Sequence, residues 1–164
     1  MKLDVSNALM HPGQEYSFPG LQAIADQEIY GDIVRIDDCT VTGTYMADDD
    51  GNISVIGQLK SVAHAPCSNC LNDASAEIEN DFDEVFVRNG DPEDDETFSY
   101  EGHVVDMEKL VMSYAVMALP IRFLCREDCP GLKYGGLDVK TEKGPDVQYP
   151  FAALKDLLNQ NEEV

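Results

Sequence analysis

Two pairs of cysteines are the residues whose type and spacing could carry chemistry in this chain. Cys67 and Cys70 form a C-x-x-C pair within APCSNCL, and Cys125 and Cys129 form a C-x-x-x-C pair within CREDCPGL. Tetrahedral zinc takes four nitrogen or sulfur ligands, which proteins commonly supply as two short-spaced pairs. The four thiolates therefore make up a candidate site for one structural zinc ion, which would anchor the second pair to the loop of the first.

Other interpretations of the cysteines stay open. The four thiols could be unligated residues that only pack against or space the chain. A thioredoxin-type C-x-x-C opens a helix whose N-terminus lowers the thiol pKa, whereas a strand pattern follows Cys70 here. A papain-like pairing with His64 or His103 is conceivable, although neither histidine has a motif around it. The fifth cysteine, Cys39, falls within a strand pattern and is expected to be a small buried residue.

The length and composition indicate one compact intracellular domain. The chain has 164 residues, of which 43% are hydrophobic, enough for one core. No apolar run approaches the ~20 residues of a membrane helix, and the start of the chain is too mixed for a secretory signal. Five cysteines do not indicate a disulfide framework, because such frameworks usually use an even number. We expect a cytoplasmic protein without membrane contact, forming a single domain over residues 1–164.

The charge argues against a general phosphate-binding surface. The chain has 11 Lys and Arg against 32 Asp and Glu, a net charge of −21, and no Lys/Arg-rich run. Proteins that grip phosphates need clustered cations, whereas acidity confers solubility or suits a basic partner. Residues 90–97, GDPEDDET, are expected to form an acidic loop, either solvated or docking a partner. The candidate partner-binding residues in it are Asp91, Glu93, Asp94, Asp95 and Glu96.

Residues 32–88 are predicted to form an antiparallel meander of three strands. The strand patterns are DIVRIDDCTVTGTYM, NISVIGQLKSVAHAP and ASAEIENDFDEVFV, separated by the turn clusters ADDDGN and CSNCLND. Gly57 interrupts the apolar face of the second strand and is expected to mark a bulge. The third strand alternates, with an acidic outer face made of Glu77, Glu79, Asp81 and Asp83.

Helical spacing begins near Asp106, a candidate N-cap, and Pro120 should end the helix. The apolar stripe of this main helix, at about 106–118, is Met107, Leu110, Val111, Tyr114 and Met117.

Residues 121–149 hold Gly and Pro throughout and predict an irregular segment. PFAALKDLLNQ predicts a short C-terminal helix, while KLDV near the start predicts a strand and SFPG a turn. The fold class expected is α+β, with an antiparallel sheet that could curl toward a barrel.

The order of these motifs resembles the YceD family, the large ribosomal RNA subunit accumulation proteins. The resemblance rests on CSNCL after a hairpin, an acidic stretch, a helix running into ALP, then CREDCPGL and a closing PFAALKDLL. It covers roughly residues 30–160. Many family members continue with a further C-x-x-C where this chain has Lys133 and Gly136, so a six-thiol site is impossible here.

The resemblance implies an accessory role in large-subunit rRNA accumulation, with no catalytic residues. It also implies a partner, either a small basic large-subunit ribosomal protein or a pre-ribosomal particle. A direct rRNA-binding module is the alternative, and its phosphate contacts would be Arg122, Arg126, Lys133, Lys140 and Lys143. A metal-dependent hydrolase using Asp81 and Asp83 is a further alternative, although acids are so abundant here that such pairs arise by chance.

Overall fold

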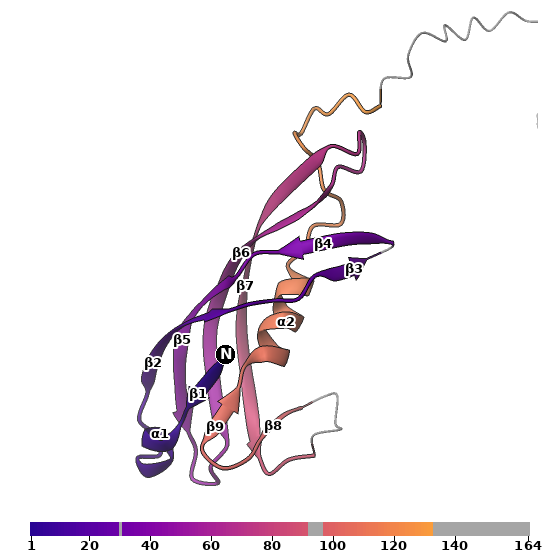
Figure 1. Cartoon of the computed structure of the whole chain (residues 1–164). Coiled ribbons are helices and arrows are strands. Elements are labelled where there is room, and N and C mark those ends of the chain that lie inside the picture. The colour runs from indigo at the N-terminus through magenta and orange to yellow at the C-terminus, as the bar shows by residue number, and fades with distance from the viewer. Residues whose placement is uncertain (30, 92–96, 133–164) are drawn as a thin grey trace, which may run out of the picture. The chain divides into compact units, whose positions relative to one another are not determined.

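The structure, a computed structural model, describes residues 1–29, 31–91 and 97–132, and it confirms the α+β class with a mostly antiparallel sheet (Figure 1). Residues Met1–Leu132 make one compact unit. The expected C-terminal helix and residues 133–149 of the irregular segment lie outside the described residues. The elements are β1 (Lys2–Asp4), α1 (Ser6–Met10), β2 (Tyr16–Gln22), β3 (Gln27–Ile29), β4 (Asp32–Ile36), β5 (Cys39–Ala47), β6 (Ile53–Pro66), β7 (Asp73–Arg88), β8 (Phe98–Tyr100), β9 (Val104–Asp106) and α2 (Glu108–Met117).

Strand β6 is the centre of a seven-stranded sheet. One of its edges pairs with β5 over Ile53–Lys60 and then with β4 at Ala63 and His64, while the other edge pairs with β7 along the whole of β6. β2 lies beyond β5, β3 beyond β4 and β8 beyond β7. β7 and β8 run parallel, the one exception to antiparallel pairing among the described strands. Those strands do not close into a barrel.

The predicted first strand of the meander is two strands, β4 and β5, which pair one after the other with the same edge of β6. The chain crosses between them at Asp37, whose N–H donates to the Val62 carbonyl at 2.9 Å. SFPG is also different from its prediction, since it belongs to strand β2 and not to a turn. Pro19 is tolerated there because β2 is an edge strand, where a missing N–H removes no ladder bond on the open side.

The predicted bulge at Gly57 is wrong, because the register of β6 with both neighbours runs through it without interruption. Gly57 lies opposite Gly43 on one side and Phe82 on the other. A Cβ at Gly57 would lie 2.5 Å from the Thr42 carbonyl oxygen and 2.6 Å from Cζ of Phe82. Glycine is therefore required by the close approach of the Phe82 ring and the neighbouring backbone.

The alternation predicted for β6 and β7 is confirmed. Val55 and Leu59 of β6 and Phe82 and Phe86 of β7 are buried, while the acids of the outer face of β7 are exposed. Helix α2 covers the inward face, burying Met107, Leu110, Val111 and Ala115. The predicted stripe is wrong at Met117, which is 64% exposed on the last turn. The side chain of Asp106 accepts the Glu108 N–H at 3.0 Å at the start of α2, although the N-cap position itself is Met107.

Two polar residues on the inward face of β7 hold this helix. The amide of Asn80 donates to the Tyr114 carbonyl at 3.1 Å, and the Tyr114 hydroxyl donates to the Glu84 carboxylate at 2.6 Å. The N-terminal strand β1 pairs with β9, directly before α2. The main-chain N–H of Met107 also donates to the Met1 carbonyl at 2.8 Å. The start of the chain is thus tied to the start of the helix.

Candidate metal centre

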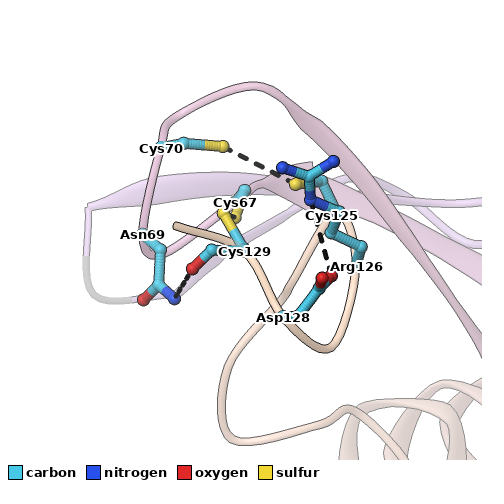
Figure 2. Close-up of polar contacts among 7 residues, drawn as sticks. All are labelled: Cys67, Asn69, Cys70, Cys125, Arg126, Asp128 and Cys129. Atoms are coloured by element: carbon cyan, nitrogen blue, oxygen red, sulfur yellow. Dashed lines mark hydrogen bonds and ion pairs between the residues drawn. The ribbon is translucent and has the colours of Figure 1, made fainter. Parts of the chain in front are cut away.

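The first cysteine pair lies in the tight loop that joins β6 to β7. Cys67 follows the last residue of β6, and its N–H donates to the Asn72 carbonyl at 2.7 Å. The Leu71 N–H donates back to the Cys67 carbonyl at 2.9 Å, with Leu71 at φ 61°, a conformation uncommon outside glycine. The C-S-N-C sequence is therefore folded into a knuckle that turns both thiols to one side (Figure 2).

The second pair lies beyond α2, in the stretch 118–132, where the described chain forms neither helix nor strand. Phe123 is buried, and its carbonyl accepts the Ser68 N–H at 2.9 Å. The side-chain amide of Asn69 lies 3.5 Å from the Cys129 carbonyl oxygen (Figure 2). The Cys129 N–H donates to the Arg126 carbonyl at 3.2 Å. These contacts attach the segment after α2 to the β6–β7 loop.

The structure brings together all four predicted cysteines. The Cys67 and Cys129 sulfurs are 3.8 Å apart, the Cys70 and Cys125 sulfurs 3.6 Å, and all four sulfurs lie within 4.8 Å of one another. Zinc–thiolate bonds of about 2.3 Å in a tetrahedron give sulfur–sulfur edges of about 3.8 Å. The four thiols therefore fit a single tetrahedral ion, and they could hold one.

The electrostatics of the cluster favour ionisation of Cys67 over Cys70 and Cys125, because the pKa is lowered for the first thiol and raised for the other two. Hydrogen bonds from the backbone N–H groups of Cys125 and Asn69 lower the pKa of Cys67 to about 6. The pKa of Cys125 is raised to about 12, first by its hydrogen bond with Cys129 and then by that with Cys70. Thiols ligate metals as thiolates. A bound cation would thus replace the protons that these sulfurs otherwise share.

The other predicted site residues are placed separately from this cluster. Arg122 and Arg126 are exposed beside it, and Nε of Arg126 lies 3.6 Å from the Asp128 carboxylate. Asp91 is exposed. The remaining predicted partner-binding and RNA-binding residues lie outside the described residues, namely Glu93, Asp94, Asp95, Glu96, Lys133, Lys140 and Lys143.

The catalytic alternatives gain no support from the geometry. Nε2 of His64 lies 3.0 Å from the Asp37 carboxylate, so this histidine pairs with an acid and not with a thiol. Asp81 and Asp83 are both exposed on the outward face of β7, where Gln58 donates to Asp81 at 2.8 Å. In the described part of the chain, the four cysteines are the group of metal-ligating side chains that converges. Cys39 is buried in β5, as expected.

Sequence reasoning did not find the residues that bring the two cysteine pairs together. Ser68 and Phe123 do so through their backbone, which no residue type encodes. Asn69 does so through its side chain, and its position between the two cysteines of the knuckle was the one available signal. Asn80 and Glu84, which bind α2, are polar residues on the otherwise apolar inward face of β7.

An open, mostly antiparallel sheet with a four-thiol cluster at one hairpin loop defines a small α+β protein with a candidate tetrathiolate site. The chain belongs to the family described as large ribosomal RNA subunit accumulation protein YceD, which matches residues 55–158, more than half of the chain. The match begins within β6 and includes both cysteine pairs, and it confirms the resemblance seen in the sequence. The family description links this chain to the accumulation of large-subunit rRNA.

No curated protein and no solved structure matches the chain. No helix among the described residues is long and apolar enough to span a membrane.

Proposed function

We propose that this chain is a non-enzymatic, cytoplasmic accessory factor for large-subunit rRNA accumulation. It binds a small basic large-subunit ribosomal protein, alone or within a pre-ribosomal particle, through its acidic surface. The observation that carries the proposal is the outward face of β7, where four exposed acids follow one another at every second position. These acids, called here the β7 acidic row, are Glu77, Glu79, Asp81 and Asp83.

The acidic row is incompletely neutralised within the described chain. The Lys60 ammonium lies 3.0 Å from the Glu79 carboxylate, and Asp81 accepts a neutral hydrogen bond from Gln58. Successive row members are about 7 Å apart along the strand, so their charges repel one another. A cationic partner would relieve this repulsion, and the net charge of −21 would steer it toward the molecule. Such a factor could hold a basic protein away from rRNA until assembly requires it.

The four cysteines have a structural part in this proposal. One zinc ion held by Cys67, Cys70, Cys125 and Cys129 would cross-link the β6–β7 loop to the segment after α2. The sulfur–sulfur distances support tetrahedral ligation, and four protein thiolates leave no open position for catalysis. The ion would supply stability and not chemistry.

Calorimetry of the full-length chain with a purified basic large-subunit ribosomal protein tests the function. We expect one binding event whose affinity falls steeply from low to high salt, because exposed charges are screened beyond about 10 Å at 0.1 M salt. A flat salt response would contradict the electrostatic mechanism. Binding to bare rRNA transcript, combined with no binding to any basic ribosomal protein, would reject the function as proposed.

Direct rRNA binding is the second candidate, since the exposed Arg122 and Arg126 flank Cys125 in one loop. Asp128 lies close to Arg126 and weakens this surface. A gel shift with a large-subunit rRNA fragment should compare the wild type with Arg122→Glu/Arg126→Glu. Lys2→Glu/Arg35→Glu is the control, because it makes the same charge change on other strands. Loss of a shift in the first variant alone would favour RNA binding.

A further inference from the structure

Among the described strands, β7 is paired along one edge only for most of its length. β6 covers one edge from Asp73 to Phe86, and β8 covers the other edge only over Phe86–Arg88. No described strand pairs with that other edge between Asp73 and Val85. At about 3.3 Å per residue this open edge is roughly 40 Å long, and its outward N–H and C=O groups are a template for another strand.

The four acids of the β7 acidic row are one of the devices by which proteins protect sheet edges, but the edge lacks the others. Proline, lysine, bulges or extreme shortness blunt most edges, and β2 at the far side of the sheet carries Pro19. β7 has no Pro, Lys or Gly between Asp73 and Val85, and its register with β6 is uninterrupted. Helix α2 bonds to the side chains of β7, at Asn80 and Glu84, on the inward face of the strand.

The charge along the edge selects the occupant. A strand added there would place alternate side chains about 5 Å from the β7 acidic row, where opposite charges stabilise and like charges destabilise the pair. A second copy of β7 would set acids against acids, whereas a segment with Lys or Arg at every second position would neutralise the row. The open edge therefore favours a basic strand over self-association.

The inward side chains of such a strand would point to the side of the sheet that α2 covers. Met112 of α2 is exposed there, and with Phe86 and Phe98 it lines a cavity of about 410 Å³. Methionine adapts to varied apolar partners. The edge is thus matched to a segment that alternates basic and apolar residues.

We propose that the edge of β7 that no described strand covers takes up an extended basic segment of the partner protein as an added strand. Backbone hydrogen bonds would supply affinity, and the acidic row on one face would select the sequence, as in other cases of strand addition. This inference rests on the proposed function and specifies how the basic partner is held.

The test uses NMR spectroscopy of the isotopically labelled full-length chain with a synthetic peptide of about 12 residues, a length typical of a long strand. The peptide alternates Lys with Val or Thr. Two control peptides keep every side chain but carry methyl groups on backbone nitrogens. The first control is methylated at the backbone nitrogens of the lysines, and the second at those of the other residues. Each control removes the N–H donors from one edge of the peptide, so one of them must lose the bonds to β7.

We expect the unmodified peptide to shift the amide resonances of Asp73–Val85 and to show cross-strand contacts with them. One of the two N-methylated controls should bind at least about tenfold more weakly, the loss of roughly one or two hydrogen bonds. Equal affinity of the three peptides, no binding of any of them, or shifts confined to other strands would overturn the inference. In that case, salt-dependent binding of the ribosomal protein would still support the proposed function. If instead the peptide adds to β7 but the ribosomal protein does not bind, the proposed function is rejected and the strand-addition site is retained.

Discussion

The Tyr114 hydroxyl on α2 donates a hydrogen bond of 2.6 Å to the Glu84 carboxylate on β7, joining the helix to the sheet. The same tyrosine ring packs edge-on against Phe82, with ring centroids 5.9 Å apart. The hydrogen bond to Glu84, helped by partial burial, raises the pKa of Tyr114 to about 12. Loss of the hydroxyl proton would place a phenolate against a carboxylate.

Replacing Tyr114 by Phe should lower the free energy of unfolding by about 1 kcal/mol, since one partly exposed hydrogen bond to a charged group is lost while the ring remains. Urea unfolding of the two proteins checks this. Glu84→Gln is the control, because it keeps an acceptor and should cost less. A Tyr114→Phe variant as stable as the wild type would show that the bond contributes nothing.

The same contact should depend on alkaline pH. An unfolded tyrosine titrates near pH 10, whereas Tyr114 in the folded chain titrates at about 12. The unfolded state therefore loses this proton first, so the contribution of Tyr114 is complete below about pH 10 and disappears as the pH rises toward 12. The stability gap between the wild type and Tyr114→Phe should shrink over this interval, and a constant gap would contradict the assignment.

The cysteine cluster predicts one metal ion per chain. Cys67→Ser should remove most of the metal found by elemental analysis. It should also lower Tm by roughly 10 °C, if binding contributes about 4 kcal/mol under metal-replete conditions. Cys39→Ala is the control, since Cys39 is buried in β5 away from the loop and its loss should leave the metal content unchanged. Absence of metal from the wild type would refute the site.

Any side chain at position 57 should crowd the core of the sheet. Gly57→Ala should destabilise the chain by about 1–3 kcal/mol, because its Cβ would lie 2.6 Å from Cζ of Phe82 and 2.5 Å from a backbone oxygen. Ser54→Ala, on the opposite face of β6, is the matched control and should change stability by less than about 0.5 kcal/mol. Thermal or urea unfolding distinguishes the two variants.

The acidic row predicts where a basic partner is held. Glu77→Lys/Asp83→Lys should weaken binding of the basic ribosomal protein about tenfold or more at low salt, and less at high salt. Asp49→Lys/Asp50→Lys makes the same charge change in the exposed turn between β5 and β6 and should have a smaller effect. Equal effects of the two variants in calorimetry would mean that net charge, and not this face, binds the partner.

Much of the sheet could be predicted because strand alternation is a local signal. Ile53, Val55 and Leu59 fall on one face of β6 through the period of two alone, and the acids of β7 fall on its other face. The start of α2 shortly after Asp106 was likewise visible in a change of period. Each of these features depends only on residues that are close to one another in the sequence, within a single strand or a single helical turn.

Errors arose where local pattern and chain path disagree. The stretch 32–46 reads as one strand, but β4 and β5 separate because both pair with the same edge of β6. SFPG carries turn residues, yet it lies in β2, where an edge position accepts proline. Gly57 looked like a break in β6, but the ring of Phe82 from the neighbouring strand accounts for it.

The amino-acid sequence alone determined the charge, the alternation of the strands, the cysteine spacings and, through the order of its motifs, the family. Only the tertiary structure decided that Cys67 meets Cys129 across 62 positions and Cys70 meets Cys125 across 55. It alone also decided that one edge of β7 is left without a strand among the described residues. The reason is physical: periodicity reports which face of an element is buried, whereas contacts between distant segments depend on the path of the chain between them.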